Sequence, residues 1–428
     1  MFILTTMLGN LNIRVNKLSD EFKELISNKW IRLGLFINII YLIISTCLTL
    51  TILRDFNDFS IYYNVGGQFL RDITELYNPN HYRWTFRYFP LFGLLFVPFY
   101  LLGFELGFII AQIINLFLSV LTSLYIYKIL LILNQENSEQ HGGSIFFYLF
   151  LFLVSMPQFY NYFLGQINLY VTILILISLF IFLKYETLLS EFAASFILGA
   201  STILKPFTLL IIPFLLILQV NLKEKKILFK LKRSFIRLFG VTLPIWLNFI
   251  LFLAIPTLWE DFLSVNLIGG NPVVLNHSFS LTKLIINGLY VLGIDFNQLL
   301  IILPIFFIFM VLAFIVYVFR RTSRLDLFYG YILGILIMLL VYFDSWDHHL
   351  LCLTPLLLIS LFILPKDNRI KKYFIASSFL FFCFLDLAFV GLWFVLEKIF
   401  PFNFIPTVFL LIDFLVFCLI IIQGDHLS

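Results

Sequence analysis

Charged side chains are scarce in this chain: Asp, Glu, Lys and Arg make up only 12% of its 428 residues, whereas 61% are hydrophobic. A water-soluble domain is typically about one quarter charged and about half apolar. A soluble fold cannot bury this much apolar surface, because the excess would remain exposed to water as one large patch. The composition therefore indicates a multi-spanning integral membrane protein, and the small formal charge of +4 argues against nucleic-acid binding.

Cysteine is also rare, and its placement excludes two common kinds of site. The four cysteines lie inside or at the edges of apolar runs, without metal-ligand spacing and without a disulfide framework. No Gly-rich phosphate loop precedes a predicted helix, so a nucleotide site is not expected. We expect no metal and no other cofactor.

Long apolar runs recur along the whole chain. A helix that crosses the bilayer needs about 20 apolar residues, and lipid offers no partner to open backbone groups, so spanning segments should be helical. We therefore expect an all-α fold, a polytopic bundle of about twelve transmembrane helices. The expected spans lie near 33–53, 88–104, 106–133, 145–164, 167–184, 191–220, 235–256, 299–319, 325–343, 350–364, 372–395 and 404–423.

Lysine and arginine in the short loops predict the orientation, because these residues gather on the cytoplasmic side. Residues 221–237 contain seven of them, and residues 344–349 contain none. We therefore expect an inner-membrane (plasma-membrane) protein whose polar site faces the extracytoplasmic side. Its expected parts are a cytoplasmic tail 1–32, a single membrane domain 33–423 with extracytoplasmic loops 54–87 and 257–298 and a basic cytoplasmic loop 221–234, and a short tail 424–428.

Between residues 88 and 220 two threadings through the membrane are possible. In one, every apolar run crosses once. In the other, which we favour, the Pro-flanked run 88–104 does not cross, and the run 191–220 breaks at Lys205 and Pro206 into two short helices. The second threading places residues 164–168 on the same side as the first long loop.

The first long loop opens with acidic residues. Asp55 and Asp58 follow directly after a predicted membrane helix, at the boundary between lipid and water. Partial desolvation there raises the pKa of a carboxyl group, and a nearby cation lowers it. Such a carboxylate can take a proton from a substrate hydroxyl as a general base. The alternative is that both acids cap the helix end and stay in water.

Three further positions combine polar side chains with apolar surroundings. Arg87 is a candidate phosphate ligand, or else an interfacial residue beside an aromatic belt. Gln166 and Asn168 interrupt an apolar stretch, either as hydrogen bonds between helices or as the lining of a cavity. Lys205 lies in the middle of an apolar run, which is costly and points to function. Its alternatives are a buried ion pair and snorkelling to the surface.

A short turn near residue 345 carries the densest group of chemical side chains. Trp346, Asp347, His348 and His349 follow one another between two predicted spans, beside Asp344. Acids, histidines and an indole in one external turn indicate a substrate-facing site. A metal site would need further converging ligands, and the sequence shows none.

Together these residues resemble glycosyltransferase family 87, whose members are polyprenyl-phosphate-sugar-dependent transferases of the GT-C fold, best known as α-mannosyltransferases. The similarity spans about residues 33–360, and its last stretch is the most specific. One departure is Phe89, where the family usually has a proline. The stretches that carry the resemblance are Asp58-Phe59, Tyr62-Tyr63, Leu76-Tyr77, Tyr88 to Pro98, Gly165 to Asn168, Gly199 to Pro206 and Ser345 to His349.

The resemblance implies a mechanism. A hexose, with mannose as the best-known case, moves from a polyprenyl-phosphate donor to a hydroxyl of a glycolipid or glycan acceptor at the extracytoplasmic face. Asp58 would be the general base. The donor phosphate would be held by Lys205, Arg87, His348 and His349. Substrate contacts would come from Tyr62, Tyr63, Gln166, Asn168, Trp346 and Asp347.

The residues alone leave other classes of protein open. A transporter also has an outward-facing polar site, but transporters commonly show paired half-repeats with broken helices, and only one helix here is expected to break. A lipid-linked polysaccharide polymerase would share the membrane setting and the cationic site. A structural or assembly subunit is the third alternative. Dependence of turnover on Asp58 separates an enzyme from a transporter or a scaffold.

Overall fold

The computed structural model describes most of the chain, and nothing below concerns the remaining residues. Some predicted features lie outside the described residues: most of the tail 1–32, Asp344 and the tail 424–428. The described ranges are 21–133, 142–221, 224–268, 278–294, 297–320, 325–343, 345–365, 368–388 and 399–423.

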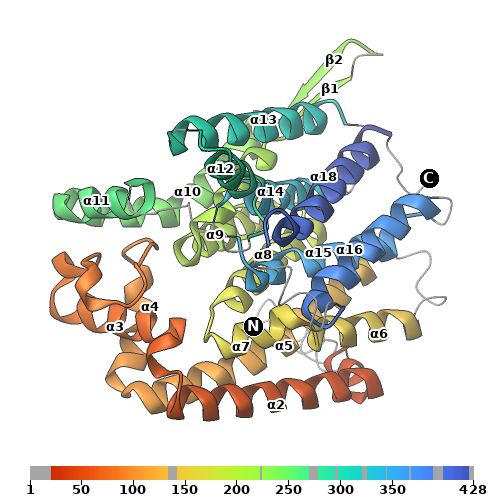
Figure 1. Cartoon of the computed structure of the whole chain (residues 1–428). Helices are drawn as coiled ribbons and strands as arrows, with labels where there is room; N and C mark the ends of the chain where they lie inside the picture. Colours follow the sequence, from red (N-terminus) through yellow and green to blue (C-terminus); the bar gives the residue numbers. More distant parts are fainter. Residues whose placement is uncertain are drawn as a thin grey trace, which may run out of the picture.

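Within these ranges the chain is almost entirely helical (Figure 1). The longer α-helices are α2 (Lys29–Thr51), α3 (Asp58–Arg71), α5 (Phe104–Leu133), α6 (Gly142–Leu153), α8 (Asn168–Lys184), α9 (Leu188–Leu204), α10 (Leu231–Ala254), α12 (Leu281–Val291), α13 (Gln298–Val318), α14 (Asp326–Val341), α16 (Arg369–Ala388) and α18 (Ile405–Gln423). Shorter α-helices are α4 (Phe92–Leu101), α7 (Met156–Phe163), α11 (Pro256–Leu263) and α15 (Thr354–Ile363). Single turns of other helix types are η1 (Arg54–Phe56), η2 (Ile73–Glu75), η3 (Pro79–His81), η6 (Ser264–Ile268), η7 (Asp347–Cys352) and η8 (Phe402–Phe404), and the longer 3₁₀ segment is η5 (Pro206–Leu215).

Six helices among the described residues are long and apolar enough to cross a membrane. The helical fold and its membrane character are therefore confirmed, whereas the expected number of about twelve crossings is not. Helix α14 explains part of the difference, because it has only 16 residues, almost all of them buried inside the bundle, and is shorter than the helices counted as full spans. The six spans are Lys29–Thr51, Phe104–Leu133, Gly143–Phe163, Leu231–Ala254, Leu300–Val318 and Phe402–Gln423.

Different elements lie at the two ends of the bundle. Helices α3, α4 and α11 gather at one end, at the left of Figure 1, and a small β-hairpin projects near the other end. Helix α4 has only 10 residues and contains Pro98. It packs closely on α3, since a Cβ on Gly66 would lie 2.5 Å from the backbone of Phe96. Whether the run 88–104 crosses the membrane stays a prediction.

The expected break at Lys205 and Pro206 is confirmed. Helix α9 ends at Leu204, and Lys205 is extended, with φ −144° and ψ 112°. Proline disfavours a helical conformation in the residue before it, and it lacks an N–H group for continuing the α-helix. The chain resumes as η5, a 3₁₀ helix, so the lysine side chain projects from the point where the two segments meet.

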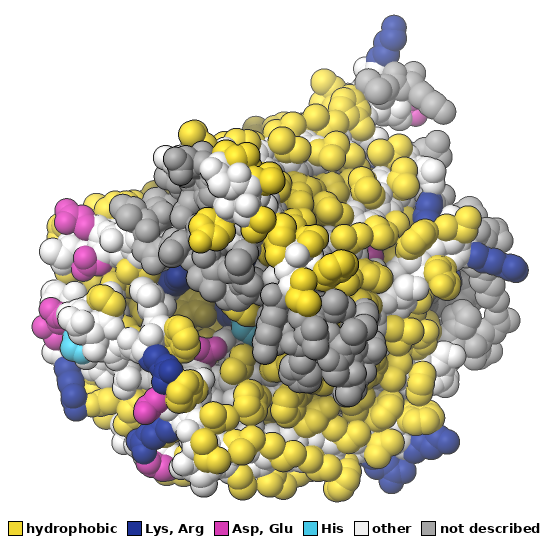
Figure 2. Space-filling view, in the orientation of Figure 1, with side chains coloured by type: hydrophobic (Ala, Val, Ile, Leu, Met, Phe, Trp, Pro, Cys, Tyr) yellow, Lys and Arg dark blue, Asp and Glu magenta, His cyan; other side chains and the backbone are white. Residues whose placement is uncertain are grey.

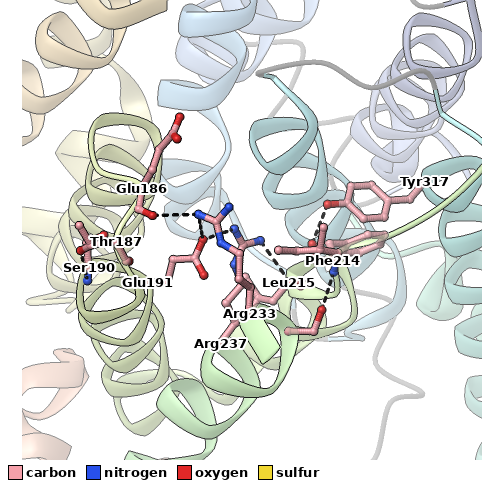
Figure 3. A network of polar contacts seen from close by, with 11 residues as sticks. Glu186, Thr187, Ser190, Glu191, Phe214, Leu215, Arg233, Arg237 and Tyr317 are labelled. Carbon is pink, nitrogen blue, oxygen red and sulfur yellow. Dashed lines mark hydrogen bonds and ion pairs between the residues drawn. The ribbon is translucent and has the colours of Figure 1, made fainter. Parts of the chain in front are cut away.

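A buried ion pair fixes α9 against α10 at the end opposite α3 (Figure 3). Glu191 has only 2% of its side chain exposed, and its Oε1 accepts from Arg233 Nη2 at 2.6 Å and from Arg237 Nη2 at 3.0 Å. Arg237 also donates to the carbonyl of Leu215 at 3.3 Å, which ties the end of η5 into the same group. This network holds both segments that flank Lys205.

One segment departs from the all-α expectation. Two short strands pair as an antiparallel hairpin, β1 (Leu218–Asn221) and β2 (Lys226–Phe229). Strand β1 ends at the start of the basic loop 221–234, and β2 lies within that loop. The sequence did not predict a strand here because four-residue strands carry little periodic signal. The base of the hairpin is held by the Lys230 amide, which donates to the carbonyl of Ile217 at 3.2 Å.

Candidate functional site

The N-terminus of α3 presents Asp58 at the first helical position. The preceding residue, Asn57, caps the helix by accepting from the Phe59 amide at 2.9 Å. Its own amide donates to Thr49 Oγ1 at 3.0 Å and to the Phe163 carbonyl at 2.8 Å. The Asp58 amide donates to the carbonyl of Leu164 at 2.9 Å. The start of α3 is therefore bound to both α2 and the segment after α7.

Gly165 makes this contact between segments possible. Its φ of +61° lies in the left-handed region, where a side chain is strained. A Cβ at this position would lie 2.4 Å from Asn57 Oδ1 and 2.7 Å from the Cβ of Phe59. A glycine is thus needed for both the backbone turn and the close approach to the cap of α3.

A single amide side chain links the predicted base to the predicted cation. Gln166 Nε2 donates to Asp58 Oδ2. Gln166 Oε1 accepts from Tyr62 OH at 3.0 Å and from Lys205 Nζ at 3.4 Å. These four side chains come from α3, the segment between α7 and α8, and the break after α9, so they are far apart in the sequence. We call them the Asp58 group.

Burial and charge act in opposite directions on Asp58. Desolvation is the larger effect and raises the pKa of the Asp58 carboxyl group to about 6. The charge of Lys205 and the hydrogen bond from Gln166 both favour the carboxylate and limit this rise. The group is therefore ionised at neutral pH yet basic enough to take a proton, which suits a general base.

Aromatic rings form one wall of the Asp58 group. Tyr62 OH lies 3.3 Å from Tyr88 OH, and the Tyr88 ring stacks on Phe92 with centroids 4.7 Å apart. Tyr77 OH donates to the Tyr88 carbonyl at 2.7 Å. The stretches that begin at Tyr62, Leu76 and Tyr88, which carry part of the family resemblance, thus pack together around the start of α3.

The turn after α14 reaches the same region. The charge of Lys205 acts on both His348 and His349, which are buried and have ring centroids 4.3 Å apart. The Trp346 amide donates to His349 Nδ1 at 3.1 Å, so that nitrogen is an acceptor. Arg87 lies over the Phe343 ring at 5.6 Å, just before the turn. The structure therefore brings all four predicted phosphate ligands to one end of the bundle.

Lys283 is a further cation that the sequence did not single out as a ligand. It is buried in α12 and lies over the Trp346 ring at 5.5 Å. The segment before α12 is fixed to the same turn, because the Phe279 amide donates to the Ser345 carbonyl at 3.0 Å. Lys283 is the one Lys or Arg in the predicted loop 257–298. The burial of Lys283 marks it as a candidate ligand, and this burial could not be predicted from the sequence.

Three predicted substrate residues are placed differently. Tyr63 packs against Tyr100 and Phe104, with centroids 5.0 and 5.4 Å away, on another side of α3 from Tyr62. Asn168 starts α8 and is fully buried, and its side chain has no hydrogen-bond partner among the described residues. Asp347 opens η7 and is partly exposed. The described contacts do not join Tyr63 to the Asp58 group.

Figure 2 shows a hollow on this end of the molecule, with basic, acidic and histidine side chains visible around and within it. Apolar side chains cover most of the remaining surface on this face. In the described part of the chain, no three His, Cys, Asp or Glu side chains converge as metal ligands. The arrangement offers one carboxylate base beside several cations, which fits the transfer of a group away from a phosphate.

Comparison with known proteins identifies the family. The model of glycosyltransferase family 87 matches residues 84–342, which contain Arg87, Gln166, Lys205 and Lys283. The match is narrower than the expected 33–360, and it leaves Asp58 and the turn at residues 345–349 outside. No curated protein and no solved structure gave a match. Because the matched segment covers more than half of the chain, this protein belongs to glycosyltransferase family 87.

Proposed function

We propose that this membrane glycosyltransferase moves a hexose, mannose in the first instance, from a polyprenyl-phosphate donor to a hydroxyl of a glycolipid or glycan acceptor. The observation that carries the proposal is the Asp58 group, in which Gln166 bridges a partly buried carboxylate and a buried lysine. A base beside a cation is what a transfer from phosphate to a hydroxyl requires. Its location at one end of an apolar bundle suits a donor whose tail lies in the bilayer.

In the proposed reaction the acceptor oxygen attacks the anomeric carbon of the donor sugar. Asp58 takes the proton of the acceptor hydroxyl, a bond forms between oxygen and carbon, and the bond from that carbon to the phosphate oxygen breaks. The polyprenyl phosphate leaves with the electron pair and gains negative charge. Lys205 and Arg87 would stabilise this charge, and His348 and His349 would supply hydrogen bonds.

We add Lys283 to the proposed phosphate ligands. Its burial against Trp346 places a positive charge beside the same turn as His348 and His349. Preorganised charge is often the largest contribution to catalysis when a leaving group becomes an anion. Trp346 would then face the sugar or the phosphate on one side and Lys283 on the other.

The proposal also covers the number of membrane crossings, the kind of membrane and the side on which the site lies. We infer a GT-C-like bundle with about twelve crossings in the plasma (inner) membrane, with the Asp58 group at the extracytoplasmic face. Support comes from the contacts of Asp58 with Leu164 and of Lys205 with Gln166, which bring the first long loop, residues 164–168 and the break at Lys205 together. This is the arrangement of the favoured threading.

The experiment that tests the function compares donors. The purified full chain in lipid nanodiscs is given radiolabelled polyprenyl-phosphate mannose, polyprenyl-phosphate glucose or a nucleotide sugar, with a membrane-lipid extract as the acceptor pool. We expect transfer from a polyprenyl-phosphate sugar and none from the nucleotide sugar. Transfer from the nucleotide sugar alone, or uptake of sugar without a new glycosidic bond, would contradict the proposal and favour another enzyme class or a transporter.

A further inference from the structure

The β1–β2 hairpin is held by regular strand pairing and by hydrogen bonds to the rest of the protein. Its strands pair in register from Leu218 with Phe229 to Asn221 with Lys226. Arg320 at the end of α13 donates to the Leu218 carbonyl at 3.0 Å and accepts through its own carbonyl from Gln219 Nε2 at 2.9 Å. These bonds fix the hairpin to the end of a membrane-spanning helix.

The second strand is apolar and uncovered on both faces. Ile227, Leu228 and Phe229 are 72%, 43% and 49% exposed. Consecutive side chains in a strand point to opposite faces, so neither face of β2 is packed on the protein. Two-stranded hairpins are marginally stable in water by themselves, and an apolar patch of this kind marks a contact with another phase or partner.

The position of the patch indicates the phase that covers it. The exposed residues of β2 continue along α10 as Leu231, Phe235 and Phe239, which are exposed on the outer side of a helix predicted to span the membrane. In Figure 1 the hairpin projects obliquely from the end of α13, up and to the right, away from the helices of the bundle. Because the apolar side chains of β2 continue the exposed apolar side of α10, the lipid that would surround α10 is the phase that we expect to cover them.

The charges of the hairpin select the kind of lipid. Four exposed lysines flank the apolar side chains of β2, and the one acid described among them, Glu224, lies 3.5 Å from Lys226. Lysines near a membrane attract anionic head groups, and their long stems allow the charge to reach the surface while the stem stays in the apolar layer. The lysines are Lys225, Lys226, Lys230 and Lys232.

We propose that the β1–β2 hairpin is an interfacial anchor, with Ile227, Leu228 and Phe229 inserted among the acyl chains and the lysines bound to anionic phospholipid head groups. The mixture of apolar and basic residues is typical of segments that lie in the interface. The inference concerns the end of the molecule opposite Asp58 and does not depend on the proposed sugar transfer. The open edge of β2 also allows pairing with a strand of a partner protein, and the test separates the two.

Insertion is tested with Phe229→Trp in the full chain, reconstituted in nanodiscs of phosphatidylcholine and phosphatidylglycerol. The parent protein provides the background fluorescence of its six tryptophans. We expect the added fluorescence to be quenched by lipids brominated near the head group and to resist aqueous iodide. Quenching by iodide but not by brominated lipid would place the strand in water or against a protein and overturn the proposal.

Lipid selection is tested by native mass spectrometry of the protein released from the same nanodiscs. Lys226→Gln/Lys230→Gln should retain several-fold less phosphatidylglycerol than the parent. The matched control, Lys29→Gln/Arg32→Gln, removes two exposed charges from α2 and should lose less phosphatidylglycerol than the hairpin variant does. Equal retention by both double variants would overturn the assignment of the head-group site to the hairpin.

Discussion

At the scale of single residues, the account depends on the ionisation of Asp58. Burial raises the pKa of its carboxyl group to about 6, so the base is protonated and inactive below that pH and ionised above it. We therefore predict that the transfer rate is about tenfold lower at pH 5 than at pH 7. The measurement is the pH dependence of kcat/KM for the donor. A profile that is flat from pH 5 to pH 8 would rule out this carboxyl group as the base.

Gln166 should set the position of that profile. Its amide donates to Asp58 and so favours the carboxylate form. In Gln166→Leu we predict that the pKa of Asp58 rises and that the midpoint of the pH profile moves upward. The control is Gln68→Leu, which changes a glutamine on α3, the helix of Asp58, outside the Asp58 group. This variant should keep the midpoint of the parent. An unshifted midpoint in Gln166→Leu would show that the amide does not act on the base.

At the scale of elements, the contact between α3 and the segment after α7 positions the base. Gly165→Ala introduces a Cβ that would lie 2.4 Å from the cap atom Asn57 Oδ1. We predict a loss of transfer of at least about tenfold, since a small misplacement of a catalytic group is costly. Gly103→Ala imposes the same kind of backbone strain, with φ +81°, but meets nothing within 4 Å. If both variants lose activity equally, strain alone explains the effect and the role of the contact is refuted.

The ion pair between α9 and α10 is expected to matter for stability. Glu191 is buried, and its removal leaves Arg233 and Arg237 without their carboxylate. Breaking a buried pair from one side costs about 3 kcal/mol, so Glu191→Gln should lower the unfolding temperature in detergent by several degrees. Glu186→Gln is the control, because only its backbone carbonyl accepts from Arg233. Equal unfolding temperatures for Glu191→Gln and the parent would contradict the assignment.

At the scale of the whole molecule, the sequence predicted the class of protein and the segments that form the site better than it predicted their contacts. Composition indicated the membrane, and proline chemistry predicted the break at Lys205. The burial of Lys283 could not be predicted, because it depends on how a long loop folds onto the turn at Trp346. Tyr63 shows the same effect of the fold, since it follows Tyr62 in the sequence but packs against Tyr100 on another side of the helix. The β-hairpin was missed because its strands are too short to show a period.

The number of crossings remains a prediction for a related reason. Hydropathy identifies apolar runs, but it does not decide whether a helix of 16 residues buried within the bundle, such as α14, crosses the membrane. Membership of glycosyltransferase family 87 supports the transferase class over a transporter or a scaffold. The base, the donor and the acceptor depend on side chains, of which Asp58 lies outside the matched segment. The central claim is therefore the role of that residue.

The most direct test of this claim compares the parent with Asp58→Asn in nanodiscs, measuring both sugar transfer and equilibrium binding of radiolabelled polyprenyl-phosphate hexose. The account predicts that the variant binds the donor as the parent does and transfers sugar at least about 100-fold more slowly, because general-base catalysis typically contributes 10²–10⁴-fold. Transfer at the parent rate by a variant that binds donor normally would contradict the account. It would leave a family 87 glycosyltransferase whose base lies elsewhere.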